Sequence, residues 1–101
     1  MEKANITGIE NFGKIHRYLI KKQKDIHGLF CNLFSEFKLN RDAIDEIDMI
    51  FDDLDNEYLY ICEKGFEFHF FITKDFVNLV IKTDIAQREL NDIMFKYFKF
   101  P

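Results

Sequence analysis

In the second half of the chain, apolar side chains recur at every second position, which is the period of a β-strand. Three such runs, "YLYICE" (58–63), "FEFHFFI" (66–72) and "FVNLVIKT" (76–83), are separated by "KG" and "TKD", both short enough for hairpin turns. Tight turns place Ile61 opposite Phe68 and Leu59 opposite Phe70, and the residues paired in this way on that face are all apolar. The pattern predicts a three-stranded antiparallel meander.

The other face of this meander mixes aromatic and polar side chains. The same pairing places Tyr60 opposite His69, and Glu67 opposite Lys82 as a cross-strand ion pair. The residues on this face are Tyr58, Tyr60, Cys62, Glu67, His69, Phe71, Asn78, Val80 and Lys82. Aromatic residues among polar neighbours are typical of protein interfaces, so this outer face is predicted to bind a partner or a second copy, unless a helix covers it.

Residues 1–40 show a different period, with apolar side chains three or four positions apart, as in an amphipathic helix. The apolar positions are Ile9, Phe12, Ile15, Leu19, Ile26, Phe30, Leu33 and Phe37. The pattern misses one step around "KKQK", where Asp25 can cap a new helix. Two helices are therefore predicted over residues 9–38, with one long helix as the alternative.

Two more helices are predicted on either side of the meander. The stretch "DAIDEIDMIFDDLD" (42–55) repeats apolar residues every three or four positions, with Asn40 or Asp42 as its cap. A similar stripe near the C-terminus consists of Ala86, Leu90, Ile93, Met94 and Tyr97. Thr83 or Asp84 is the expected cap of that last helix.

The predicted fold is α+β, with three N-terminal helices, a three-stranded antiparallel meander and a C-terminal helix, the helices packed on the apolar sheet face. A chain of 101 residues is long enough for one core, so residues 1–101 are expected to form a single compact domain. Hydrophobic residues make up 48% and charged residues 32%, which is typical of a globular chain.

The cysteine content and the apolar runs bear on location. Cys31 and Cys62 are too few for a disulfide framework and lack the paired spacing of a zinc site. No charged-then-apolar leader opens the chain, and no apolar run approaches the roughly 18 residues that a membrane span requires. An intracellular, cytoplasmic protein without a membrane segment is therefore expected.

The net charge of −4 is concentrated in the middle of the chain. Residues 1–40 carry +3, residues 41–67 carry −8 and residues 68–101 carry +1. Nine acidic residues and no basic residue lie between Arg41 and Lys64. A segment of this kind attracts basic partners and repels the phosphates of nucleic acids.

Within this segment the predicted helix over residues 42–55 places acids where they destabilise it. Asp45, Asp48, Asp52 and Asp55 are spaced three, four and three apart, so that like charges stack along one face. Several also fall near the helix C-terminus, where the dipole is negative, and the total penalty is about 1–3 kcal/mol. That is a large share of a typical stability of about 5–15 kcal/mol. The acidic face is either a solvated surface or a surface kept for a basic partner.

The sequence gives adequate support to no catalytic or metal-binding chemistry. His27 and Cys31 lie four apart, as two zinc ligands on a helix would, but no further ligands are specified. The tract from Asp53 resembles a calcium loop, yet Tyr58 stands where such a loop needs glycine. Cys62 is expected opposite Glu67, which leaves it without an imidazole to activate it. No enzyme activity, metal or cofactor is therefore predicted.

Direct binding of nucleic acid is not expected either. Helices followed by a hairpin are compatible with a winged helix, whose third helix enters the major groove. Here that helix is the acidic one over residues 42–55, and its charge is of the wrong sign for contact with phosphates.

The leading hypothesis is a small acidic protein-binding domain that inhibits a basic, nucleic-acid-handling protein such as a nuclease. Immunity proteins and phage-encoded inhibitors work in this general way, by placing carboxylates where phosphates would bind. The candidate partner-binding residues are Asp45, Asp48, Asp52, Asp53, Asp55, Glu57, Tyr58 and Tyr60. The alternative is a homodimeric accessory or regulatory domain that uses the outer sheet face, and a small metal-dependent or thiol enzyme is a third, poorly supported class.

Overall fold

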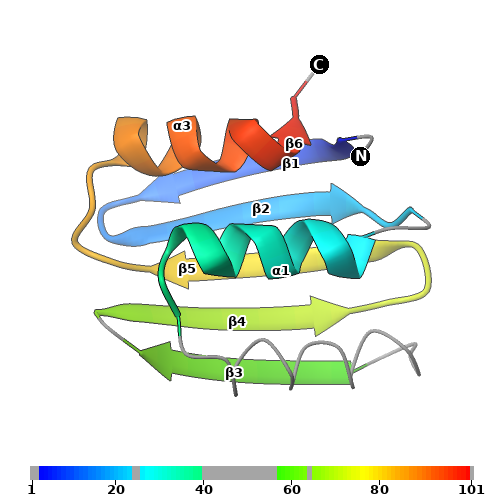
Figure 1. Cartoon of the computed structure of the whole chain (residues 1–101), viewed down its shortest axis with the longest axis horizontal. Helices are drawn as coiled ribbons and strands as arrows, with labels where there is room; N and C mark the ends of the chain where they lie inside the picture. Colours follow the sequence, from blue (N-terminus) through cyan, green and yellow to red (C-terminus); the bar gives the residue numbers. More distant parts are fainter. Residues whose placement is uncertain (1–2, 24–25, 40–56, 64, 101) are drawn as a thin grey trace.

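The computed structural model describes residues 3–23, 26–39, 57–63 and 65–100. Its elements are β1 (Ala4–Phe12), β2 (Ile15–Lys21), α1 (Ile26–Glu36), β3 (Glu57–Glu63), β4 (Phe66–Ile72), β5 (Phe76–Lys82), α3 (Gln87–Tyr97) and β6 (Phe98–Lys99). The strands form one sheet in the order β3-β4-β5-β2-β1-β6. Both described helices lie on the same side of this sheet, α1 across its middle and α3 along β1 (Figure 1).

The helix predicted at the start of the chain, before Asp25, is wrong. Residues 4–21 form an antiparallel β-hairpin of β1 and β2 where a helix was predicted. The sheet consequently has six strands and is mixed, because β6 runs parallel to β1. Because residues 4–21 form strands of a six-stranded sheet, the prediction of three N-terminal helices, a three-stranded meander and a C-terminal helix does not hold. The helix predicted over residues 42–55 lies outside the described part of the chain.

The helical spacing in this hairpin comes from apolar side chains on both of its faces. Tyr18 and Ile20 of β2 point into the core and are fully buried. Phe12, Ile15 and Leu19 point the other way and are exposed. Apolar residues on both faces break the simple alternation of a half-buried strand, and their combined spacing resembles a helical period.

Two backbone features complete the hairpin. The register of β1 and β2 shifts between Ile6 and Gly8, so that β1 has one extra residue there, as in a β-bulge. The turn between the strands consists of Gly13 and Lys14, and Gly13 has φ +61°. A two-residue turn with glycine at a positive φ in its first position matches the type II′ geometry that suits a hairpin.

Helix α1 confirms the helix predicted to begin after Asp25, a residue that lies outside the described part. Its buried positions are Ile26, Leu29, Phe30, Leu33 and Phe34. The helix ends at Glu36, Lys38 beyond it has φ 57°, and the N–H of Leu39 donates to the carbonyl of Phe34 at 3.1 Å. This is the hydrogen bond of a Schellman motif, here with lysine in the place that usually belongs to glycine.

The pairing predicted for the second half of the chain is confirmed, although these strands are part of a larger sheet. Ile61 pairs with Phe68, and Tyr60 pairs with His69 across β3 and β4. Glu67 pairs with Lys82 across β4 and β5. Strand β5 then pairs with β2, which joins the meander to the N-terminal hairpin.

Helix α3 covers the β1–β2 side of the sheet. Leu90 and Met94 are buried, and the hydroxyl of Tyr18 donates a hydrogen bond to Asn91 Oδ1. The predicted cap at Thr83 or Asp84 is wrong, because the N-cap residue is Ala86 and no side chain caps the helix. Thr83 Oγ1 instead accepts from the N–H of Ile85.

Phenylalanine side chains form the centre of the core between α1 and the sheet. Phe34 makes edge-to-face contacts with Phe68 and Phe70, with ring centroids 5.1 and 5.5 Å apart. Phe30 contacts Phe70 from the next turn of α1, at 5.5 Å. Edge-to-face aromatic pairs add about 0.5–1.5 kcal/mol to the stability that comes from burial.

Candidate functional site

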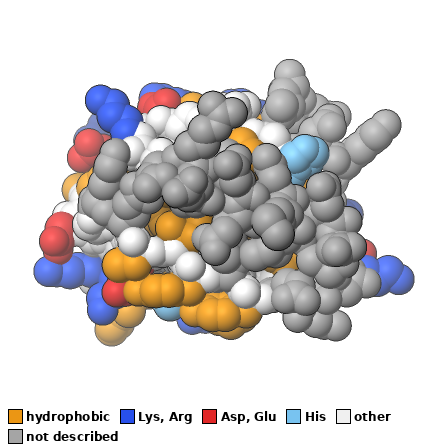
Figure 2. Space-filling model, turned by 60° about the horizontal axis from the view of Figure 1, so that its bottom comes forward, with side chains coloured by type: hydrophobic (Ala, Val, Ile, Leu, Met, Phe, Trp, Pro, Cys, Tyr) orange, Lys and Arg blue, Asp and Glu red, His pale blue; other side chains and the backbone are white. Residues whose placement is uncertain are grey.

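The side of the sheet that faces away from α1 and α3 is the outer face, and no described helix lies on it. The cross-strand pairing arranges it in three rows. The rows are Tyr58-Phe71-Asn78-Leu19-Gly8, Tyr60-His69-Val80-Arg17-Glu10 and Cys62-Glu67-Lys82-Ile15-Phe12. Figure 2, which brings the β3 edge of the sheet forward, shows hydrophobic side chains gathered along the lower border of the molecule.

Four aromatic side chains of β3 and β4 form a connected surface on the outer face. These are Tyr58, Tyr60, His69 and Phe71, the aromatic quartet. Tyr58, Tyr60 and Phe71 are 49%, 45% and 45% exposed. The rings of Tyr58 and Phe71 lie 4.9 Å apart, as do the rings of Tyr60 and His69. The Tyr58 hydroxyl is hydrogen-bonded to His69 Nδ1 at 2.7 Å. The quartet is therefore held in place by ring contacts and a hydrogen bond while its surface stays accessible.

Tyr60 also links the quartet to the polar row beside it. Its hydroxyl donates to Glu67 Oε1 at 3.4 Å. A hydrogen bond with Cys62, followed by desolvation and the charges of Cys62 and Glu67, raises the pKa of Tyr60 to about 12. Tyr60 therefore stays a neutral phenol in the physiological pH range.

The charges on the outer face largely compensate one another across neighbouring strands. Arg17 lies 3.8 Å from Glu10, and Lys82 lies 3.9 Å from Glu67. Exposed pairs of this type contribute at most about 1 kcal/mol to stability. Their main effect is that this face carries little net charge.

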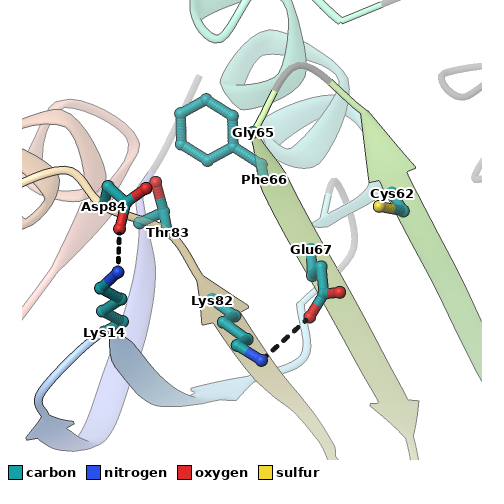
Figure 3. A pocket seen from close by; sticks show the side chains of 8 residues that line it. All are labelled: Lys14, Cys62, Gly65, Phe66, Glu67, Lys82, Thr83 and Asp84. Atoms are coloured by element: carbon teal, nitrogen blue, oxygen red, sulfur yellow. Dashed lines mark ion pairs between the residues drawn. The ribbon is translucent and has the colours of Figure 1, made fainter.

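An open pocket of about 300 Å³ lies where the ends of β3, β4 and β5 meet the β1–β2 turn. Figure 3 shows its lining, with two ion pairs between side chains of different elements. Lys14 Nζ lies 2.6 Å from Asp84, and this hydrogen bond raises the pKa of Lys14 and lowers that of Asp84. The second pair is Lys82–Glu67. The four charged side chains that line the pocket therefore form two ion pairs with one another.

The structure brings together some of the predicted binding residues. Tyr58 and Tyr60 lie side by side on the exposed outer face, next to His69 and Phe71. Glu57 is the first residue of β3. The remaining predicted binding residues lie outside the described part of the chain; they are Asp45, Asp48, Asp52, Asp53 and Asp55.

Three residues of the outer face are not predicted from the sequence to lie there, because the sequence pattern predicts a helix at their positions. Phe12, Ile15 and Leu19 of the N-terminal hairpin extend the apolar surface away from the aromatic quartet. The signal that could have found them is the glycine-containing turn at residues 13–14, which has the same length as the "KG" turn at residues 64–65.

One polar side chain is buried on the helix-facing side of the sheet. His16 is 1% exposed, and its Nδ1 lies 2.7 Å from Asn11 Oδ1. Its Nε2 has no hydrogen-bond partner among the described residues. Burial lowers the pKa of His16, so the folded protein favours the neutral imidazole.

The protein is expected to lose stability through His16 as the pH falls below about 6.5, the usual histidine pKa. Below that pH the unfolded chain binds a proton that the buried imidazole resists, so the free energy of unfolding decreases. In denaturant titrations at pH 7 and pH 5, His16→Gln should show a smaller decrease than the wild type. The exposed His27→Gln serves as the control, and an unchanged decrease in His16→Gln would contradict the prediction.

Neither metal ligation nor a membrane helix is evident in the part of the chain that the structure describes. No three His, Cys, Asp or Glu side chains in this part lie close enough to share a metal ion. None of its helices has the length and apolar character needed to cross a membrane. No protein-family model matches the chain, and neither a curated protein nor a solved structure is significantly similar to it.

Proposed function

We propose that this protein is a non-catalytic, cytoplasmic protein-binding domain whose outer sheet face is the binding surface. The placement of its exposed apolar side chains carries the proposal. Seven large hydrophobic residues are exposed in the described part of the chain, and six of them belong to the three rows of the outer face, while Phe100 follows β6 at the far edge of the sheet. Burial of apolar surface contributes about 25 cal/mol per Å², so these six side chains favour coverage by another molecule.

The preorganisation of the aromatic quartet supports the same proposal. Tyr58 and His69 are already hydrogen-bonded, and each ring of the quartet contacts a neighbour. A partner therefore loses little binding energy to the ordering of these side chains. Tyrosine is also among the residues that most often dominate binding energy at interfaces.

An unused hydrogen-bond acceptor lies in the same face. Asn78 stands between Phe71 and Leu19 in its cross-strand row, and its Oδ1 is buried without a donor in the described part of the chain. A buried acceptor without a donor costs about 1–3 kcal/mol. A partner that supplied an N–H or O–H group would remove this cost once the Asn78 amide turned outward to meet it.

The second candidate function is inhibition of a basic, nucleic-acid-handling protein such as a nuclease. The observation in its favour is the sequence around the quartet, since the segment 41–67 carries −8 and includes both exposed tyrosines. Carboxylates would speed the encounter with a basic partner, and Tyr58 and Tyr60 would supply contacts that exclude water. Both candidate functions use the quartet. They differ in whether the negative charge of the segment 41–67 is needed for binding.

Capture of partners from a lysate of the native cells tests these functions. We expect Phe71→Ser to reduce capture of the bound protein at least about tenfold relative to the wild type, as for a central interface aromatic. Phe100→Ser is the matched control, since Phe100 is similarly exposed but follows β6, at the sheet edge opposite the quartet. Equal capture by wild type and Phe71→Ser would contradict the proposed surface.

A charge-reversed variant in the same experiment separates the two candidates. If the acidic segment contributes, Asp48→Lys/Asp52→Lys loses the partner, and capture by the wild type weakens as the salt concentration rises. If this variant captures the partner as the wild type does, the acidic segment is not part of the interface.

A further inference from the structure

We infer that the occupant of the outer face is a second copy of this chain, bound about a two-fold axis with the aromatic quartets of both copies in the interface. The inference rests on the proposed function and names its partner. In this arrangement the two sheets pack face to face about 10 Å apart, with the helices of both copies outside. The same surface is then used by both copies, as two-fold symmetry requires.

The charge of the outer face favours a second copy over a strongly charged partner. Its described acids are Glu10 and Glu67, and each lies beside a cation of the neighbouring strand. The four cations on this face are Arg17, Lys21, Lys82 and, at the β6 edge, Lys99, which leaves a net charge of +2. Two such faces repel one another only weakly, whereas a basic or acidic partner finds little opposite charge to meet.

The arrangement of the cations also disfavours single-stranded nucleic acid as the occupant. Nucleic-acid platforms combine stacking rings with cations that contact phosphates. Arg17 lies in the row of Tyr60 and His69, where Glu10 engages it. Lys82 lies in the next row, where Glu67 engages it. The rings of the quartet are in turn packed on one another.

The size of the outer face is close to what a dimer needs. Five strands about 4.8 Å apart, with seven residues of about 3.4 Å each, cover roughly 600 Å² in projection. Side-chain relief makes the accessible area larger than this projection. Standard interfaces bury about 800 Å² per partner, so coverage of the whole face by a second copy gives an interface of ordinary size.

Sedimentation equilibrium of the purified full chain over a range of concentrations tests the inference. We expect a reversible dimer whose dissociation constant rises at least about tenfold in Phe71→Ser and stays unchanged in Phe100→Ser. Tyr58→Ser repeats the test from the neighbouring strand, and circular dichroism verifies that each variant is folded. Because each copy carries −4, added salt should leave the dimer unchanged or tighten it, opposite to a complex with a basic protein.

Two outcomes would overturn the inference. One is a chain that stays monomeric at about 1 mM, or a dimer that Phe71→Ser and Tyr58→Ser leave intact. The other is binding of a labelled single-stranded oligonucleotide that these variants abolish. A monomer that still captures another protein through Phe71 would disprove the second copy and leave the proposed function standing, so the two failures are distinguishable.

Discussion

Phe70→Ala is expected to lower the free energy of unfolding by about 3–5 kcal/mol, whereas Phe71→Ala, one position along the same strand, should lower it by about 1 kcal/mol or less. The two residues differ only in the face of β4 that they occupy. Phe70 is fully buried and lies 5.5 Å from the rings of both Phe30 and Phe34. Phe71 is exposed and contacts Tyr58.

The physical reason for the large effect is the cavity that alanine would leave at position 70. Close-packed interiors relax only partly around a deleted side chain, so the lost burial adds to the cost of the cavity. Both aromatic contacts between α1 and β4 at this point would also disappear. At position 71 the deleted ring borders solvent, and no closed cavity forms.

Chemical denaturation of the two variants, read by far-UV circular dichroism, measures this difference. Phe71→Ala also provides a check on the proposed interface, because it should weaken partner binding while it leaves the fold intact. If Phe70→Ala and Phe71→Ala destabilised the protein equally at concentrations where the chain is monomeric, both faces of β4 would have to be buried within one copy, and the outer face would not be an accessible surface.

The strands that are predictable from sequence are those whose two faces differ in composition. In β4 and β5 the inward positions are all apolar, so a shift by one residue would bury the polar set and the register is well determined. This is why the pairing of Tyr60 with His69 and of Glu67 with Lys82 is predicted correctly.

The N-terminal hairpin is not predictable in this way, because it departs from the rule that polar residues are exposed and apolar residues are buried. His16 is polar and buried, while Phe12 and Ile15 are apolar and exposed. The irregularity between Ile6 and Gly8 also moves the later residues of β1 to the opposite face. An observer of the sequence alone therefore finds no period of two in this region, although Gly13 marks the turn.

The candidate site is partly predictable for the same reason. The outer position of Tyr58 and Tyr60 follows from the alternation of β3, and the structure adds their packing against His69 and Phe71. The extension of the apolar surface across β2 and β1 depends on pairing between β5 and β2, which is distant in sequence. Such long-range pairing leaves no local signal in the residues that make it.

Phe98→Ala is expected to lower the free energy of unfolding by about 3–5 kcal/mol, and Phe100→Ala should change it by no more than about 0.5 kcal/mol. Phe98 is fully buried, with its ring 5.3 Å from that of Phe30. Phe100 is 52% exposed. The sequence places both residues after the last predicted helix and offers no reason to distinguish them.

The difference arises from the way β6 closes the sheet. Phe98 pairs with Ala4 of β1, and its N–H donates to the carbonyl of Met94 at the end of α3. Its side chain thereby fixes the C-terminal end of α3 against the sheet and against α1. Loss of the ring removes the apolar contact that holds these three elements together, while the backbone bonds alone contribute only about 1 kcal/mol each.

Thermal or chemical unfolding of the two alanine variants beside the wild type provides the measurement. Hydrogen exchange adds a local readout, since Phe98→Ala should speed exchange at the amides of β1 and the last turn of α3 before it affects β4. Equal stability of the two variants would mean that β6 does not anchor α3. In that case the stability of α3 would have to come from Leu90, Met94 and the Tyr18–Asn91 hydrogen bond alone.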